Sequence, residues 1–387
     1  MEKLCSNASG HGNNFDLIRF TLAVMVIFTH SYLIYYGNLD GKAREPLIIF
    51  THGQLTFGTA AVNSFFLISG FLVFKSLLAS KSIISFVIKR IRRIYPAFIV
   101  VTLFFILVSV PLSYGGPGKP LPDFVHIWSA TDFKVVAHAI LFLHDVYITE
   151  ALVDLPAFYV TNASLWTIRY ECILYFFLAL LGMMRVFRIH KLVPLFLFLA
   201  VLCVNIIHHN GFIHWIYTGQ MPDFYLPPFL APHREKYLWF EHFLLYFTSG
   251  MCFYAYRDYV PRSKYLLLLS GVVLLVSARW ATAFELSFSI FGAYALFYLA
   301  FSKTIKLHHF GKYGDLSYGI YLFGCPIQGL AMLYLGKSIG FYGTLFASLA
   351  IIIPIAFLSW HLVEKPALSF KTNPPDGLKL GAPSPSV

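Results

Sequence analysis

The first apolar segment of the chain, NNFDLIRFTLAVMVIFTHSYLI, carries an arginine and a histidine at a helical spacing. Arg19 and His30 are eleven positions apart, close to a whole number of turns, so they share one face of a helix, with His30 about 16 Å further along the axis. Asp16, three residues before Arg19, can pair with its guanidinium. A neutral imidazole at mid-membrane depth can act as a general base. The alternative is a histidine bonded to a neighbouring helix and an arginine that reaches the headgroups.

A second candidate is the basic segment SFVIKRIRRIYPAF. Arg90 and Arg93 are one helical turn apart, so their guanidinium groups can hold a phosphate or pyrophosphate together. The alternative is that these residues only anchor the segment at the membrane surface.

A third candidate is the segment NASLWTIRYECILYFF. Arg169 and Glu171 are two residues apart and cannot face each other on a helix, so each needs a partner elsewhere. Two charges within an apolar segment favour a polar cavity over a wall that faces lipid. Ser69-Gly70, in an earlier apolar segment, is a small pair that permits close packing of helices.

These residues must be positioned by membrane helices. The 387 residues are 58% hydrophobic and 12% charged, and the mean hydropathy is +0.69. A soluble fold with so few charges could not cover its surface. Backbone groups in lipid must be satisfied within each segment, so we expect an all-α, polytopic integral membrane protein.

Apolar runs broken by Pro, Gly and charge predict about ten transmembrane helices. Their cores are 15–36, 57–79, 94–112, 164–184, 192–209, 238–256, 265–280, 284–302, 315–335 and 341–362. Most of the 29 Lys and Arg residues fall in alternate connections, which predicts that the N- and C-termini are both cytoplasmic. We expect one transmembrane domain over residues 1–366 and a short cytoplasmic, disordered tail over 367–387.

Other features of the composition exclude several classes of protein. The net charge of +11 comes from short connections between apolar segments and not from a nucleic-acid module. The five cysteines are scattered and predict neither a metal site nor a disulfide framework. We expect no permanently bound cofactor.

Six short segments together resemble the acyltransferase 3 family of membrane acyltransferases. They run in order from about residue 13 to residue 366. The matching pieces are Arg19 with His30, FFLISGF at 65–71, Arg90 with Arg93, SLWTIRYE at 164–171, GDLSYGIYLF at 314–323 and WHLVEKP at 360–366.

The resemblance implies transfer of an acyl group, usually acetyl, from cytoplasmic acyl-CoA to a carbohydrate such as O-antigen or exopolysaccharide. It implies a multi-pass protein of the bacterial inner membrane in contact with membrane lipid. His30 would be the catalytic histidine and Arg19 its partner, and Arg90 and Arg93 would contact the phosphates of acetyl-CoA. Glu171 would have a structural or acceptor-site role.

Two routes for O-acyl transfer stay open from the sequence. His30 can deprotonate the acceptor hydroxyl for direct attack on the thioester, or an acylated enzyme residue can relay the group. The rival class is a proton-coupled secondary transporter or polysaccharide exporter that uses the same charges as a proton relay. A structural or sensor protein without turnover is a third class. The aromatic stretch 210–237 could stack on sugar rings, although an interfacial aromatic belt looks the same.

Overall fold

The computed structural model describes residues 3–4, 13–115, 133–143, 162, 164–189, 192–218, 234–280, 283–302 and 308–370. Within these ranges the regular structure is helical, and the β-contact is one isolated bridge between Lys3 and Pro261. Residues 219–233 of the aromatic stretch and residues 371–387 of the predicted tail lie outside the described ranges.

Six helical segments in the described part of the chain are long and apolar enough to cross a membrane. They are α1 (Phe15–Tyr36), α4 (Phe57–Leu78), the run Ile83–Ser113 that begins with α5 (Ile83–Phe104), α9 (Trp166–Met183), and the two runs Ser317–Gly336 and Ser338–Ser369. These segments suit a multi-pass membrane protein.

Two short helices overlap the ends of these runs, α6 (Val110–Gly115) and α17 (Lys365–Ser369). The other helices are α2 (Asn38–Arg44), α3 (Pro46–Phe50), α8 (Phe133–Phe142), α10 (Val186–Ile189), α11 (Val193–Thr218), α12 (Arg234–Ala255), α13 (Lys264–Ser277), α14 (Phe284–Ser287) and α15 (Ala293–Ala300). Each of the ten predicted segments overlaps a helix.

Hydroxyl side chains fix where two of the site-bearing helices begin. Thr56 precedes α4 and accepts a hydrogen bond from the backbone N–H of Thr59 at 3.0 Å. Ser82 precedes α5 and accepts from the N–H of Ser85 at 3.1 Å. Both are N-caps, which satisfy backbone donors that a helix leaves free at its start. As a result the basic segment and the apolar segment after it form one helix, whereas the sequence interpretation began the third span only at residue 94.

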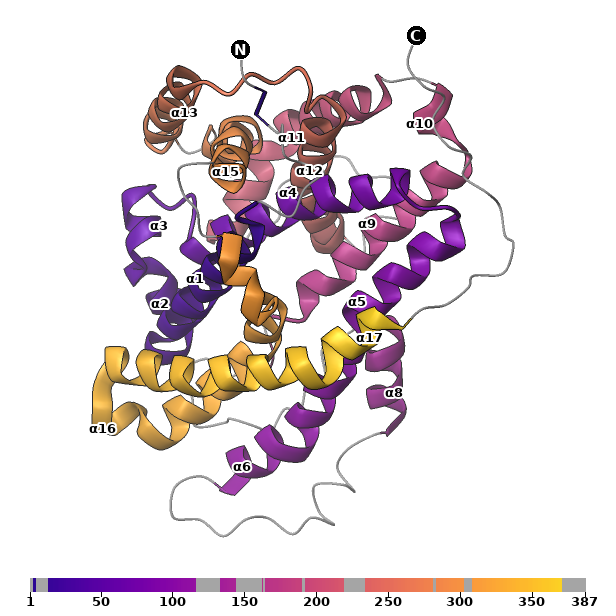
Figure 1. Cartoon of the computed structure of the whole chain (residues 1–387). Coiled ribbons are helices and arrows are strands. Elements are labelled where there is room, and N and C mark those ends of the chain that lie inside the picture. The colour runs from indigo at the N-terminus through magenta and orange to yellow at the C-terminus, as the bar shows by residue number, and fades with distance from the viewer. Residues whose placement is uncertain are drawn as a thin grey trace.

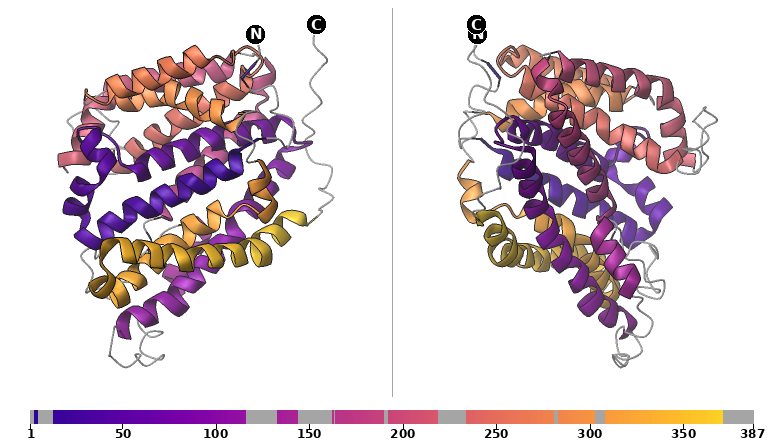
Figure 2. Two further views of the ribbon diagram at one scale, coloured as in Figure 1. Left: turned by 60° about the vertical axis from the view of Figure 1, so that its left-hand side comes forward. Right: turned by 90° about the vertical axis from the view of Figure 1, so that its right-hand side faces the viewer.

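The first helix lies between two others in the core of the molecule. α1 packs against α4 on one side and against α16 (Ser317–Ser359) on the other (Figure 1; Figure 2, left). α16 is divided at Gly340, whose φ of +68° is a left-handed conformation that favours glycine. The chain reverses there, so the two halves of α16 run alongside each other (Figure 1).

The other face of α4 packs closely against α12. A Cβ atom at Gly70 would lie 2.0 Å from the carbonyl oxygen of Phe247, and one at Gly250 would lie 2.1 Å from that of Leu67. Only glycine permits this approach of two backbones. The predicted packing role of the Ser69-Gly70 pair is therefore confirmed for Gly70.

Candidate functional site

A chain of ion pairs joins four separate parts of the sequence. Arg19 lies 2.5 Å from Asp16, as the helical spacing predicted, and 3.2 Å from Asp315. Arg93 lies 2.5 Å from the same Asp315 oxygen and 3.3 Å from Glu364. Two arginines are thus held by three carboxylates, and the network connects α1, α5 and the end of the chain's last helical run.

The charge of Asp315 is stabilised by its neighbours. The residue lies just before α16, and burial alone would raise its pKa. The guanidinium groups of Arg19 and Arg93 and the hydrogen bonds from Ser317 instead hold the pKa of this carboxyl well below its usual range. Asp315 therefore remains a carboxylate at every physiological pH.

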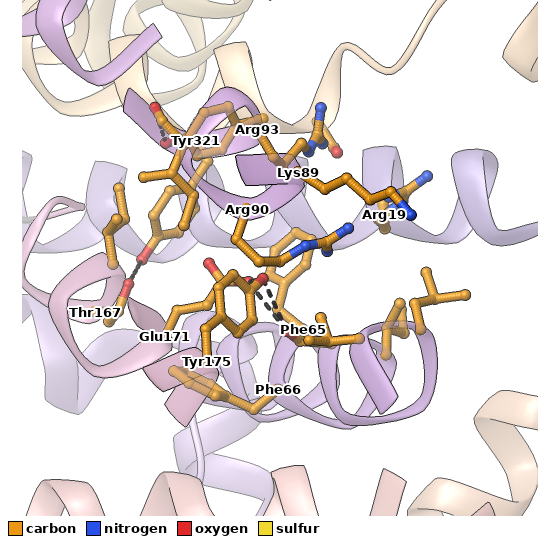
Figure 3. A pocket seen from close by; sticks show the side chains of 18 of the residues that line it. Arg19, Phe65, Phe66, Lys89, Arg90, Arg93, Thr167, Glu171, Tyr175 and Tyr321 are labelled. Atoms are coloured by element: carbon orange, nitrogen blue, oxygen red, sulfur yellow. Dashed lines mark hydrogen bonds between the residues drawn. The ribbon is translucent and has the colours of Figure 1, made fainter. Parts of the chain in front are cut away.

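Next to this network lies a cavity of about 420 Å³ (Figure 3). Its walls come from α4, α5, α9 and the start of α16, and α1 contributes Arg19. One end is strongly basic, because four side chains from one short stretch of α5 gather there with one from α1. These basic residues are Arg19, Lys89, Arg90, Arg92 and Arg93. Further in, the wall is largely aromatic and aliphatic, so the cavity suits a ligand with an anionic head and a less polar arm.

The two arginines of the predicted phosphate site differ in their surroundings. Arg93 is engaged by Asp315 and Glu364, whereas Arg90 forms no ion pair within the described residues. The Nε of Arg90 is buried there without a hydrogen-bond partner, and its guanidinium carbon lies 5.7 Å from the centre of the Tyr175 ring. Arg90 therefore has donor capacity left for an anion, while Arg93 is held in place by carboxylates.

Glu171 forms part of the cavity wall together with two hydroxyl groups (Figure 3). The Ser69 hydroxyl donates to Glu171 at 3.1 Å, and the Tyr175 hydroxyl donates to the same oxygen. Ser69 and Tyr175 also lie 3.2 Å apart. The partners that the sequence required for this charge thus come from α4 and from the next turn of α9.

His30 does not line the cavity. Its Nδ1 is buried and has no hydrogen-bond partner among the described residues. The helix around it is fixed from two sides. Thr29 donates to the buried Glu45 at 2.9 Å, and Gln328 of α16 donates to Ser31 at 2.7 Å. The structure therefore brings Arg19, Arg90, Arg93 and Glu171 to one cavity and places His30 apart from it.

Asp315 and Glu364 were not assigned a role from the sequence. Both lie in segments that carried the family resemblance, GDLSYGIYLF and WHLVEKP. Acidic residues are scarce in this chain, and Glu364 is only 2% exposed, so a carboxylate at the edge of an apolar segment was an available signal. No group of three or more His, Cys, Asp or Glu residues that could hold a metal occurs in the described ranges.

Comparisons with known proteins add a family relationship. A family model described as "Acyltransferase domain" matches residues 13–363. The chain is 27% identical to an "O-acetyl transferase" of Shigella phage Sf6 over 365 residues, which cover 91% of this chain and 95% of that protein. It is 28% identical to "Nodulation protein 10" of Rhizobium leguminosarum bv. viciae over 393 residues, covering 95% of this chain and 96% of that protein. No solved structure gives a significant match.

Proposed function

The chain belongs to the acyltransferase 3 family, and from that premise we propose that it is an O-acetyltransferase that takes its acetyl group from cytoplasmic acetyl-CoA. The acceptor is a hydroxyl of a cell-surface or lipid-linked carbohydrate. The O-acetyl transferase name of the phage relative supports the reaction type.

One observation favours acetyl-CoA as the donor. At the basic end of the cavity, Arg90 has no carboxylate partner among the described residues. Coenzyme A has a pyrophosphate and a 3′-phosphate at one end and a flexible arm that ends in the thioester. Arg90, with Lys89 and Arg92 beside it, would hold the phosphates. The arm would lie along the less polar walls toward Phe65 and Tyr321.

His30 is proposed as the general base. Its imidazole takes the proton of the acceptor hydroxyl, the oxygen attacks the thioester carbonyl, and the carbon–sulfur bond breaks. Coenzyme A leaves as the thiolate and takes up a proton. The relay route, in which an enzyme residue is first acylated by the thioester, remains open.

The proposal includes an orientation in the membrane. About ten spans, with both termini in the cytoplasm, place Arg19 and the basic end of the cavity on the cytoplasmic side. The distribution of Lys and Arg supports this arrangement. The domain boundaries proposed are residues 1–366 for the transmembrane domain and 367–387 for a cytoplasmic tail, and the membrane is the bacterial inner membrane.

The direct test is a transfer assay with the purified chain in lipid vesicles. Labelled acetyl-CoA is supplied on one side and surface glycans are supplied as acceptors. The expected result is release of free coenzyme A thiol together with label on the glycan. Uptake of an intact solute driven by a proton gradient, without thiol release, would support the transporter class instead.

A further inference from the structure

A hydrogen bond between two helices lies on the wall of the cavity. The Tyr321 hydroxyl of α16 lies 2.5 Å from the Thr167 hydroxyl of α9, and both residues are largely buried. The Phe65 ring of α4 meets the Tyr321 ring edge-on, with the ring centres 6.0 Å apart. All three residues line the cavity, and Tyr321 and Thr167 lie on the side away from Arg19 (Figure 3).

His30 does not line the cavity and lies deeper along the helices than the Tyr321 and Thr167 pair. On α1, Ala23 and Val26 lie on the face between Arg19 and His30, and both are buried and absent from the cavity wall. Gln328 of α16 donates to the carbonyl of Ile27 at 2.8 Å, which sets the depth of the His30 turn. Gln328 is seven residues after Tyr321, so the His30 level is about 10 Å deeper than the last α16 residue of the wall.

We propose that Tyr321 and Thr167 form a gate between the donor cavity and His30. Acetyl-CoA binds with the gate closed, and separation of the two hydroxyls lets the thioester reach the imidazole. This inference rests on the proposed function. Tyr321 would then control when the donor meets the base.

The chemistry of the pair suits such a gate. A tyrosine hydroxyl is both a donor and an acceptor, so the Tyr321 O–H can exchange the Thr167 oxygen for the carbonyl oxygen of an arriving thioester. The polar group is then never left unpaired in a buried place, which is the main penalty for breaking a buried hydrogen bond. A brace with a purely structural role has no need to lie on the wall of the cavity.

The test is a reversible lock across the gate. Thr167→Cys and Tyr321→Cys are combined in a chain whose five native cysteines are replaced by serine, and a short, cleavable bifunctional thiol reagent joins the pair. We expect the cross-linked protein to bind acetyl-CoA with the same affinity before and after reduction, to lack transfer while cross-linked, and to regain transfer on reduction. Transfer at an equal rate before and after reduction would overturn the gate while leaving the acetyltransferase assignment intact. Absence of transfer by the unmodified wild-type chain would instead count against the proposed function.

A second pair of variants covers the case in which the double-cysteine protein is inactive. Tyr321→Phe and Thr167→Val keep the shape of the residues and remove the hydrogen bond. At saturating acetyl-CoA we expect an increased release of thiol in the absence of acceptor, because water then reaches a thioester that is no longer held back. A lower kcat without any increase in acceptor-independent release would show a structural brace and would overturn the proposal, as would wild-type behaviour in both measurements.

Discussion

Arg93 and Asp315 lie 222 positions apart in the chain, yet their side chains meet at 2.5 Å beside the cavity. The same carboxylate oxygen is 3.2 Å from Arg19, so helices α1 and α5 share one acceptor just before α16. This shared acceptor fixes the relative position of the helix that carries His30 and the helix that carries Arg90.

Replacement of the shared acceptor should destabilise the protein. Asp315→Asn leaves two largely buried guanidinium groups facing each other without their common counter-charge. Removal of one member of a buried ion pair typically costs about 3–5 kcal/mol. We expect a clear drop in the thermal unfolding midpoint in detergent. Asp258→Asn is the matched control, because the Asp258 side chain is 69% exposed and its ion pair with Arg257 lies at the surface.

The effect of Asp315 should also depend on pH with a definite sign. A carboxyl whose pKa is lowered in the folded state stabilises the fold above its ordinary pKa of about 4, and this contribution is lost as the pH falls through the lowered value. The difference in stability between the wild-type chain and Asp315→Asn should therefore be constant from pH 8 to about pH 5 and shrink only in stronger acid. A difference that changes near neutral pH would contradict the assignment of a permanently charged Asp315.

Arg90 and Arg93 should behave differently when each is replaced by alanine. Arg90→Ala removes a proposed phosphate contact of the charge-assisted kind, worth about 1.5–3 kcal/mol, and should raise the KM for acetyl-CoA about ten- to hundredfold. Its thermal stability should change little, because Arg90 forms no ion pair in the described part of the chain. Arg93→Ala should lower stability as well, because it leaves Asp315 and Glu364 without a shared cation.

A conservative variant controls this comparison. Arg90→Lys keeps the charge and loses the planar fork of donors, so it should show an intermediate KM. An unchanged KM in Arg90→Ala would return this residue to the role of a surface anchor.

Glu171 can be tested by separating its charge from its hydrogen bonds. Glu171→Gln keeps an oxygen that accepts from Ser69 and Tyr175, whereas Glu171→Ala leaves both hydroxyls without this acceptor. We expect the alanine variant to lose more transfer activity than the glutamine variant, since the position of the Tyr175 ring beside Arg90 depends on that acceptor. Equal losses would mean that the charge itself, and not the hydrogen bonding, is what matters.

Contacts between residues close together in the chain could be predicted from the sequence, but the contacts between distant segments that form the site could not. The pairing of Asp16 with Arg19 follows from a three-residue spacing on one helix, and the close approach at Gly70 follows from a small residue in an apolar segment. The partners of Arg93 lie 222 and 271 positions away, and no periodicity reports a contact at that distance. Arg90 and Arg93 look equivalent in sequence, since only the tertiary fold decides which of them meets a carboxylate.

The position of His30 relative to the cavity was also beyond the sequence. Its spacing from Arg19 gave the shared face and the axial separation of the two residues. The contacts among Tyr321, Thr167 and Phe65 join three other helices, α16, α9 and α4, and no spacing along the chain reports them. The role of His30 as general base remains a prediction. In the proposed gate, the Tyr321 and Thr167 hydroxyls must separate before His30 can reach the thioester.

The most direct measurement of the central claim is acetyl transfer by His30→Ala, with acetyl-CoA binding recorded on the same preparation. We expect donor affinity equal to that of the wild-type chain and no measurable acetyl transfer to the glycan, since general acid–base assistance is worth about 10²–10⁴-fold in rate. His52→Asn is the control, because His52 is exposed in a turn with a positive φ that asparagine tolerates. Transfer by His30→Ala at a rate close to that of His52→Asn would contradict the account.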